Sequence, residues 1–201
     1  MDEAEKQTQK TKEPVSLEKS IMLYLHDLIY MLAAVMLVFL LLFRVVIVSG
    51  SSMYATLWDG DWLLVLSSVF YTEPEQGDII IASKESFKNG EPIVKRMIAD
   101  EGQTVDIDFE AGIVYVDGVP LQEDYIHNLT TTYEGVDFPL TVEEGCIFVM
   151  GDNRRESKDS RSPEIGFVEK REILGKAVFL MFPGTDEGCA QRDFDRIGAL
   201  S

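Results

Sequence analysis

The chain has 201 residues, of which 46% are hydrophobic and 26% are charged, and this composition excludes an intrinsically disordered protein. The net charge is −17, and from Ser49 onward 13 Lys and Arg stand against 29 Asp and Glu, because only five basic and six acidic residues come earlier. Such an acidic balance argues against nucleic acid as a partner, since binding to phosphates needs basic patches, and it favours solubility.

The first predicted element is a membrane anchor at residues 28–48. The run from Leu28 to Phe43 contains no charge, although a straight span needs about 20 apolar residues, so Arg44 is expected to extend to the interface. A buried core helix is one alternative, which the apolar character of every face disfavours. A cleavable signal peptide is another, which the preceding polar residues and the β-branched exit disfavour.

The distribution of basic residues predicts the orientation of this anchor. Three lysines between residues 10 and 19 precede it, whereas no Lys or Arg follows Arg44 until Lys84. The positive-inside rule therefore predicts a single-pass protein of the cell membrane, with residues 1–27 as a cytoplasmic tail and residues 49–201 as an extracytoplasmic domain.

Residues 49–201 are predicted to form one mostly antiparallel β domain. Short apolar runs rich in β-branched residues are typical of strands, and Asp117-Gly118 is a strong signal for the turn of a hairpin. The secondary structure of the segment between Gln122 and Glu144 is less clear from the sequence, and it is either a loop or an inserted subdomain. The predicted strands begin near Asp61, Asp78, Ile93, Thr104, Gly112, Cys146 and Leu174.

A serine and a lysine are the candidate catalytic residues. A serine hydroxyl needs a nearby base to become nucleophilic, and histidine is the usual one. The chain has only His26, at the edge of the anchor, and His127, in a loop-like stretch. A neutral lysine is the alternative base, but the pKa of a free lysine is about 10.4, so burial must lower it by several units.

The surroundings of Lys95 in the sequence suit this role. In an extended strand it shares one face with Ile93, Met97 and Ala99, which places the amine among apolar side chains. The spacing alone favours the alternative, a solvated lysine at a strand edge. The motif in which the lysine lies reverses that preference.

Three motifs resemble those of the type I (leader) signal peptidases, membrane-bound serine proteases that remove signal peptides from exported preproteins. The first is the segment Ser-Met-Tyr-Ala-Thr-Leu that begins at Ser52, in which Ala55 replaces the usual proline. The second is a Lys-Arg pair that begins at Lys95. The resemblance implies that Ser52 is the nucleophile, that Lys95 is the general base, and that the N–H groups of Gly50 and Ser52 form the oxyanion hole.

The third motif is the most specific of the three. The family pattern is Gly-Asp-Asn-Arg, two variable polar residues, Ser, one further residue and Asp-Ser-Arg. Arg155 and Glu156 replace a common Asp-Asn pair, and the alternative of an ordinary solvated loop is improbable with so many matches. The matched positions are Gly151, Asp152, Asn153, Arg154, Ser157, Asp159, Ser160 and Arg161.

The resemblance also implies supporting roles within this third motif. Ser157 is expected to hydrogen-bond to the catalytic lysine and to orient it. Asp159 is expected to pair with Arg161, and Asp152 with an arginine such as Arg96.

The resemblance extends from the anchor to about Phe182. It implies a mostly β, signal-peptidase-type catalytic domain on a single transmembrane helix, of the compact Gram-positive-like form, that cleaves preproteins after small-x-small sites. Ser52 follows Phe43 by nine residues, so it lies within about 30 Å of the end of the anchor and works near the membrane surface. Candidates for the walls of the substrate pockets are Met53, Ile79 and Ile81.

Two other functions stay open. A self-cleaving repressor-type Ser-Lys protease shares the fold, but it would carry a DNA-binding segment and no anchor. A catalytically inactive, membrane-tethered peptidase-like binding or assembly factor would be expected to have lost Ser52 or Lys95.

The expected partners are preprotein signal peptides and the lipid around the anchor, with no nucleic acid, no metal and no cofactor. No spacing of Cys and His indicates a zinc site. Cys146 and Cys189 are too few to indicate a disulfide framework, and whether they pair stays open.

Overall fold

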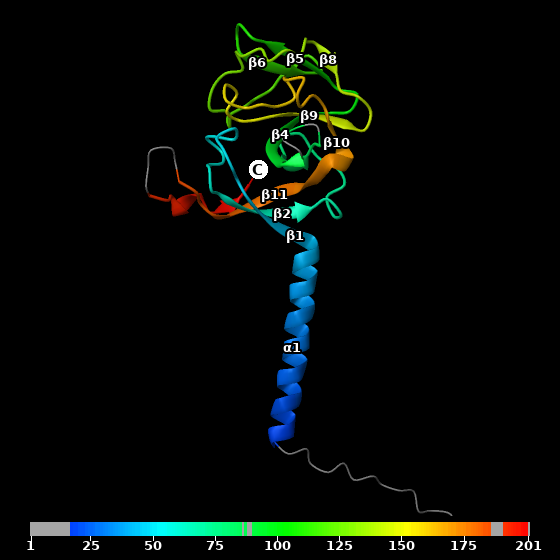
Figure 1. The fold of residues 1–201 in the computed structure, drawn as a ribbon, viewed down its shortest axis with the longest axis vertical. Helices are drawn as coiled ribbons and strands as arrows, with labels where there is room; N and C mark the ends of the chain where they lie inside the picture. Colours follow the sequence, from blue (N-terminus) through cyan, green and yellow to red (C-terminus); the bar gives the residue numbers. More distant parts are fainter. Residues whose placement is uncertain (1–16, 86, 88–89, 186–190, 201) are drawn as a thin grey trace, which may run out of the picture. The chain divides into compact units, whose positions relative to one another are not determined.

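The structure is a computed structural model that describes residues 17–85, 87, 90–185 and 191–200. The chain divides into two compact units, Met1–Leu40 and Leu41–Ser201. The described part of the first unit is helical, and the second unit is built mainly from β-strands (Figure 1).

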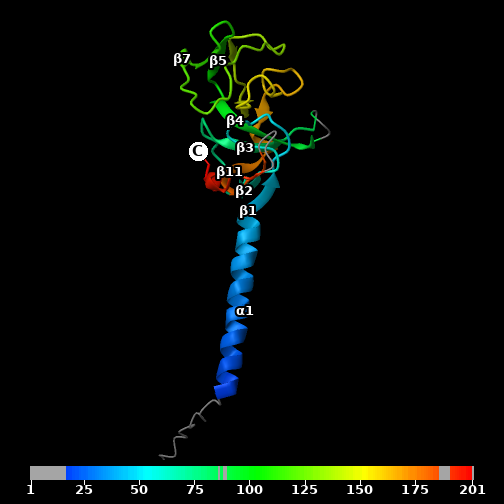
Figure 2. The same cartoon turned by 90° about the vertical axis from the view of Figure 1, so that its left-hand side faces the viewer.

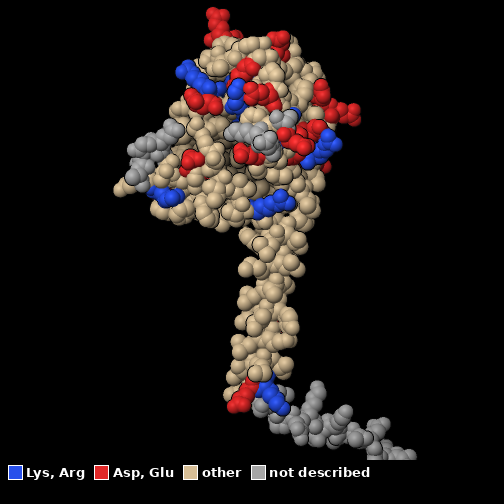
Figure 3. All heavy atoms as spheres, in the orientation of Figure 1, with Lys and Arg blue, Asp and Glu red and all other residues tan. Residues whose placement is uncertain are grey.

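Helix α1 (Leu17–Leu42) has 26 residues and therefore extends for about 39 Å at 1.5 Å per residue. Leu, Met and Ala, which favour helices, dominate its sequence. None of its residues is buried, and it is long and apolar enough to cross a membrane. Figure 3 shows a surface almost free of charge along the helix, whereas acidic side chains are scattered over the β-rich unit.

The bounds of α1 differ from those predicted for the anchor, residues 28–48. The helix begins earlier, because residues 17–27 are mostly good helix formers, and it ends earlier, at Leu42. Strand β1 (Phe43–Ile47) follows at once and pairs with β2 (Trp62–Ser67). Three of its five residues are β-branched and favour an extended backbone, so Arg44 lies in a strand rather than at a helix end.

The second unit has the predicted fold class, because its strands pair in an antiparallel sense in two sheets. The larger sheet has the order β1-β2-β11-β3-β4-β9-β10, with β12 paired to β11. Its further strands are β3 (Ile79–Ser83), β4 (Pro92–Asp100), β9 (Cys146–Met150), β10 (Val168–Glu169), β11 (Ile173–Phe182) and β12 (Gly198–Ala199). The short helices η2 (Lys170–Glu172) and η3 (Phe194–Arg196) flank β11 in the sequence.

The smaller sheet has the order β7-β6-β5-β8 and lies at one end of this unit in both views (Figures 1 and 2). Its strands are β5 (Thr104–Asp108), β6 (Ile113–Val116), β7 (Val119–Pro120) and β8 (Leu140–Thr141). The predicted hairpin is present between β6 and β7, and both turn residues have positive φ angles, 51° at Asp117 and 77° at Gly118. Strand β8 lies in the segment whose order was unclear from the sequence.

Clusters of buried apolar side chains hold the two segments that carry Ser52 and Lys95. Met53 and Leu57, directly after Ser52, are 1% and 0% exposed and pack against side chains of β2, β3 and β11. Ile93 and Met97, on the same strand as Lys95, pack in a second cluster with β3 and β9. Apolar residues next to both polar groups therefore fix their positions.

Candidate active site

Ser52 and Lys95 meet in the structure, although 43 positions separate them in the sequence. Lys95 Nζ donates a hydrogen bond to Ser52 Oγ at 2.7 Å. Ser52 lies in a turn after β1 and is partly exposed, whereas Lys95 lies within β4 and is 4% exposed. A buried amine in contact with a reachable hydroxyl is the arrangement that a Ser-Lys nucleophile needs.

The register of β4 places the Lys95 side chain on an apolar face. Ile80 on β3 is its partner, and this residue belongs to the same buried cluster as Ile93 and Met97. As the alternation of the strand predicts, Ile93, Lys95 and Met97 lie on one face. A register shift between Met97 and Ala99 then breaks the alternation, and Ala99 packs in another cluster.

Ser52 and Lys95 line one cavity of about 550 Å³. Residues 46–48, at the end of β1, and residues 92–95, at the start of β4, form two of its sides. β1 ends the strand order of its sheet, and β9 pairs with β4 only from Arg96 onward, so both segments have a free edge among the described strands. Met53 lines this cavity as predicted, whereas Ile79 and Ile81 are not among its lining residues.

The third sequence motif holds residues 50–57, the turn that carries Ser52 and is called the serine turn here, by hydrogen bonds. The Asn153 N–H donates to the Ser52 carbonyl oxygen at 3.0 Å, and Asn153 Nδ2 donates to the Ser51 carbonyl oxygen at 3.1 Å. A Cβ atom at Gly151 would lie 2.4 Å from the Ser52 carbonyl oxygen and 2.2 Å from Ser157 Oγ. Only glycine allows this close approach of the two loops.

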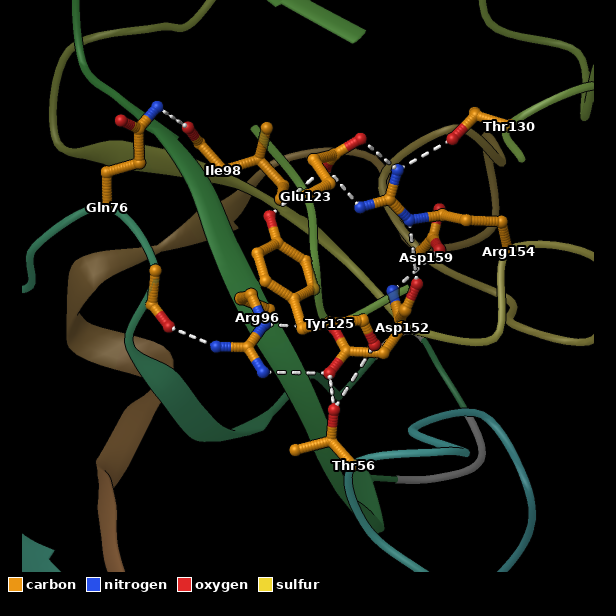
Figure 4. Close-up of polar contacts among 12 residues, drawn as sticks. Thr56, Gln76, Arg96, Ile98, Glu123, Tyr125, Thr130, Asp152, Arg154 and Asp159 are labelled. Atoms are coloured by element: carbon orange, nitrogen blue, oxygen red, sulfur yellow. Dashed lines mark hydrogen bonds and ion pairs between the residues drawn. The ribbon is translucent and has the colours of Figure 1, made fainter. Parts of the chain in front are cut away.

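A buried ion pair connects the lysine strand to the same motif (Figure 4). Arg96 Nη2 lies 2.8 Å from Asp152 Oδ2 and Nε lies 3.0 Å from Oδ1, with side-chain exposures of 2% and 0%. Thr56, from the serine turn, donates to Asp152 at 2.5 Å, and the Arg96 guanidinium stacks 4.0 Å from the centre of the Tyr125 ring. Asp152 is therefore shared by three segments of the site.

A second buried ion pair lies within the motif itself. Arg161 Nε and Nη2 each lie 2.8 Å from an oxygen of Asp159, and Nη2 also lies 3.2 Å from Glu134 Oε1. The Gly151 N–H donates to Asp159 Oδ2 at 3.0 Å. Burial alone would raise the pKa of Asp159, but the hydrogen bonds and the charge of Arg161 outweigh it and hold this pKa below its usual value.

The lowered pKa of Asp159 predicts a loss of stability in acid. A carboxyl whose pKa is lower in the folded chain stabilises it above the unfolded pKa, about 3.9, and this contribution is lost as the pH falls through the folded pKa. We expect the free energy of unfolding to decrease steadily below about pH 4, measured by urea unfolding in detergent. The decrease should be less steep in Asp159→Asn; an equal slope in both proteins would contradict this assignment.

Two roles predicted from the sequence, that of Ser157 beside the lysine and that of Gly50 in the oxyanion hole, are not formed in this structure. Ser157 Oγ is buried and has no hydrogen-bond partner among the described residues, so it does not bond to Lys95, whose Nζ points to Ser52 instead. The Gly50 N–H donates to Asp59 Oδ1 at 2.7 Å in this structure, so this bond has to open before the N–H can bind an oxyanion. The pairs Asp159–Arg161 and Asp152–Arg96 are both present.

Sequence analysis missed a group near the C-terminus that clamps the serine turn. Arg196, from η3, binds both oxygens of the fully buried Asp61 at 3.0 and 2.7 Å and donates to the Thr56 carbonyl oxygen at 3.1 Å. Its guanidinium also stacks 3.8 Å from the Trp58 ring centre. The Gly184 N–H adds a bond of 2.6 Å to Asp61. No local pattern indicates these contacts, because the partners lie 135 positions apart.

Removing this clamp is expected to destabilise the chain. Arg196→Ala leaves the buried Asp61 carboxylate without its cation, and we expect a loss of about 3 kcal/mol in the free energy of unfolding. Arg196→Lys should recover only part of this loss in stability, because an ammonium group cannot bind both carboxylate oxygens in a bidentate manner. Urea unfolding of the full chain in detergent measures both values; equal stability of Arg196→Ala and the wild type would contradict the role of the clamp.

The cysteines and possible metal ligands give no further site. Cys146 is buried with a free thiol, and burial raises its pKa, while Cys189 lies outside the described residues. Within the described ranges, no group of three or more His, Cys, Asp or Glu residues is placed to hold a metal ion.

Comparisons with known proteins assign the chain to a family. The family described as "Signal peptidase, peptidase S26" matches residues 21–182. A probable signal peptidase I-1 of Synechocystis sp. is 38% identical over 153 residues, which cover 70% of this chain and 72% of that protein. A signal peptidase I of Bacillus amyloliquefaciens is also 38% identical over 153 residues, covering 72% and 77%.

A crystal structure of a signal peptidase I from Enterococcus faecalis is 35% identical and covers 52% of this chain and 97% of its own, with a TM-score of 0.43. The relatives from Synechocystis and Bacillus amyloliquefaciens, both named as signal peptidases, support neither the repressor-type protease nor the inactive binding factor. From the match over most of its length, the chain belongs to the signal peptidase family, peptidase S26, and is a serine endopeptidase.

Proposed function

We propose that the chain is a membrane-anchored signal peptidase in which Ser52 attacks the scissile carbonyl and the neutral amine of Lys95 takes the serine proton. The observation that carries this proposal is the 2.7 Å hydrogen bond between Lys95 Nζ and Ser52 Oγ, made by a lysine that is 4% exposed. Burial favours the neutral form of an amine, because water no longer stabilises the ammonium.

The charges around Lys95 influence whether its amine is protonated or neutral. The Asp159 carboxylate and the Lys95 ammonium attract each other, which favours the charged form of the lysine. Arg161 pairs with both Asp159 and Glu134, and its positive charge offsets one of these two carboxylates. Burial raises the pKa of Glu134, which favours the neutral form of that carboxyl and so reduces the remaining negative charge near the lysine.

The reaction is an acyl transfer in two steps. Ser52 Oγ forms a bond to the carbonyl carbon while its proton moves to Lys95 Nζ, and the ammonium then protonates the leaving amine as the C–N bond breaks. A water molecule next attacks the ester, loses its proton to Lys95 and releases the signal peptide. The returning proton restores the Ser52 hydroxyl.

The oxyanion would be stabilised by backbone donors. The Ser52 N–H is one, and the Gly50 N–H is the second if its bond to Asp59 opens when substrate binds. Each such donor is worth about 10²–10³ in rate. Asp59 is exposed, so water can replace Gly50 as its partner at small cost.

The cavity supports the assignment of an extended peptide as substrate. Its two strand segments, residues 46–48 and 92–95, have free edges that can hydrogen-bond to a peptide backbone. Val46, Val48 and Ile93 supply apolar walls, which suit the small residues before the cut. Helix α1 would anchor the protein in the cell membrane, with the N-terminus in the cytoplasm and the β-rich domain outside.

Cleavage of a purified preprotein with an Ala-x-Ala site in liposomes tests this proposal. We expect a single cut, which gives a mature protein with the mass expected for cleavage directly after the second alanine. Replacement of that alanine by phenylalanine is expected to abolish this cut, because signal peptidases favour small residues at this position. No cleavage by the folded wild type, or equal cleavage of both substrates, would contradict the proposal.

A further inference from the structure

A second cavity adjoins the serine turn, and neither Ser52 nor Lys95 lines it. It measures about 570 Å³ and is lined by polar and aromatic side chains, among them Tyr54, His127, Asn128 and Arg155. We propose that it binds the first residues of the mature protein, after the cut, and that Arg155 makes it favour acidic over basic side chains at the second and third of these residues. This inference rests on the proposed peptidase function.

The position of this cavity follows from its shared walls. Ser51 and Glu156 line both this cavity and the one that holds Ser52 and Lys95, and the two have no other lining residue in common. A peptide that lies in the first cavity and continues past the serine turn therefore enters the second. The residues before the cut occupy one cavity, and the residues after the cut occupy the other.

The chemistry of the walls decides which side is which. The first cavity includes Val46, Val48, Met53 and Ile93, which suit the small apolar residues before the cut. The second is lined mainly by amide, imidazole and charged groups. Mature sequences are polar at their start because they continue into a water-soluble protein, so they match the second cavity.

The second cavity is held in shape by its own hydrogen bonds. The Arg155 N–H donates to Asn128 Oδ1 and Asn128 Nδ2 donates to Asn153 Oδ1, both at 3.0 Å. The His127 N–H donates to the Asp152 carbonyl oxygen at 3.0 Å, and the His127 ring meets the Tyr54 ring edge-on at 4.7 Å. The loop that carries Arg155 is therefore fixed against the serine turn.

The charges give the cavity its selectivity. The side chains of Arg155 and Glu156 are exposed, and neither forms an ion pair with another described residue. Glu156 lies where the two cavities adjoin, next to the first mature residue, whereas Arg155 lines only the second cavity. Within a domain that carries 13 basic against 29 acidic residues, Arg155 is the positive group that an acidic side chain at the second or third position meets.

Substrates that differ only at the second mature residue test this inference. We expect the wild type to cleave the Asp form with a kcat/KM about two- to fivefold higher than the Lys form at low salt, the size of an exposed charge interaction. The Asp-to-Lys ratio of kcat/KM should invert in Arg155→Glu. In the wild type, this ratio should approach one at high salt. Arg171→Glu, which changes an exposed arginine outside both cavities, serves as the control and should keep the wild-type ratio.

The same ratio can be measured without cleavage. Binding of the uncut Asp and Lys substrates to Ser52→Ala protein, with and without Arg155→Glu, separates this inference from the proposed catalytic mechanism. The expected result is tighter binding of the Asp form that Arg155→Glu reverses. An Asp-to-Lys ratio that is the same with and without Arg155→Glu, in cleavage and in binding, would overturn the inference.

Discussion

Replacement of Lys95 by alanine is expected to lower kcat/KM for preprotein cleavage by about 10²–10⁴-fold, which is the typical contribution of a general base. Ser52→Ala should cost more, on the order of 10⁶-fold, because no nucleophile remains. The reason lies in the 2.7 Å bond between the two side chains, which makes them one unit. The double variant should therefore be no less active than Ser52→Ala alone.

The control for this prediction is Lys170→Ala. Lys170 is a partly exposed lysine that binds Asp100 and Glu101, away from the cavity, and its loss is expected to leave cleavage unchanged. Initial rates of cleavage of one preprotein in liposomes compare the four variants with the wild type. Wild-type rates in Lys95→Ala would show that another group activates the serine.

Removal of Arg96 is expected to produce the largest loss of stability, about 3–5 kcal/mol in the free energy of unfolding. Arg96→Ala leaves the Asp152 carboxylate buried without its cation, and an uncompensated buried charge is costly. The variant also loses the stacking on Tyr125 and the bond from Arg96 to the Gly77 carbonyl oxygen. Since whole domains are stable by about 5–15 kcal/mol, such a loss leaves a protein near its unfolding threshold.

An exposed arginine gives the matched comparison for Arg96. Arg171 binds Glu169 on the surface, with side-chain exposures of 82% and 43%, and Arg171→Ala should cost at most about 1 kcal/mol. Urea unfolding of the full chain in detergent compares the two variants. Similar losses in both would show that the buried pair between Arg96 and Asp152 contributes no more than a surface pair.

Local patterns in the sequence were enough to predict much of the fold. Short apolar runs predict β2, β3, β4 and β5, and the Asp117-Gly118 pair predicts the hairpin, because these signals depend on neighbours in the chain. The predicted meeting of Ser52 and Lys95 came from a family resemblance, since periodicity shows only that Lys95 shares a face with apolar residues. The structure brings the two side chains together as that resemblance implies.

The remaining features depend on contacts that no local pattern contains. The anchor was assigned to residues 28–48 because apolar composition does not separate a helix from a strand, and the pairing of β1 with β2 decides this boundary. The engagement of Gly50 depends on the fold of the turn back to Asp59. Arg196 lies beyond the part of the chain that matches the family, and it joins this tail to the serine turn through the Thr56 carbonyl oxygen.

Chemical restoration of the amine at position 95 tests the central claim most directly. Lys95→Cys, in a chain whose Cys146 and Cys189 are replaced by alanine, can be alkylated with 2-bromoethylamine to give a lysine analogue with sulfur in place of one methylene group. We predict that the unmodified variant is inactive and that alkylation restores cleavage after the same alanine, with the acidic limb of the pH–rate profile at lower pH because sulfur makes the amine less basic. Cleavage by the unmodified variant, or no cleavage by the folded, alkylated one, would contradict the assignment of Lys95 as the base.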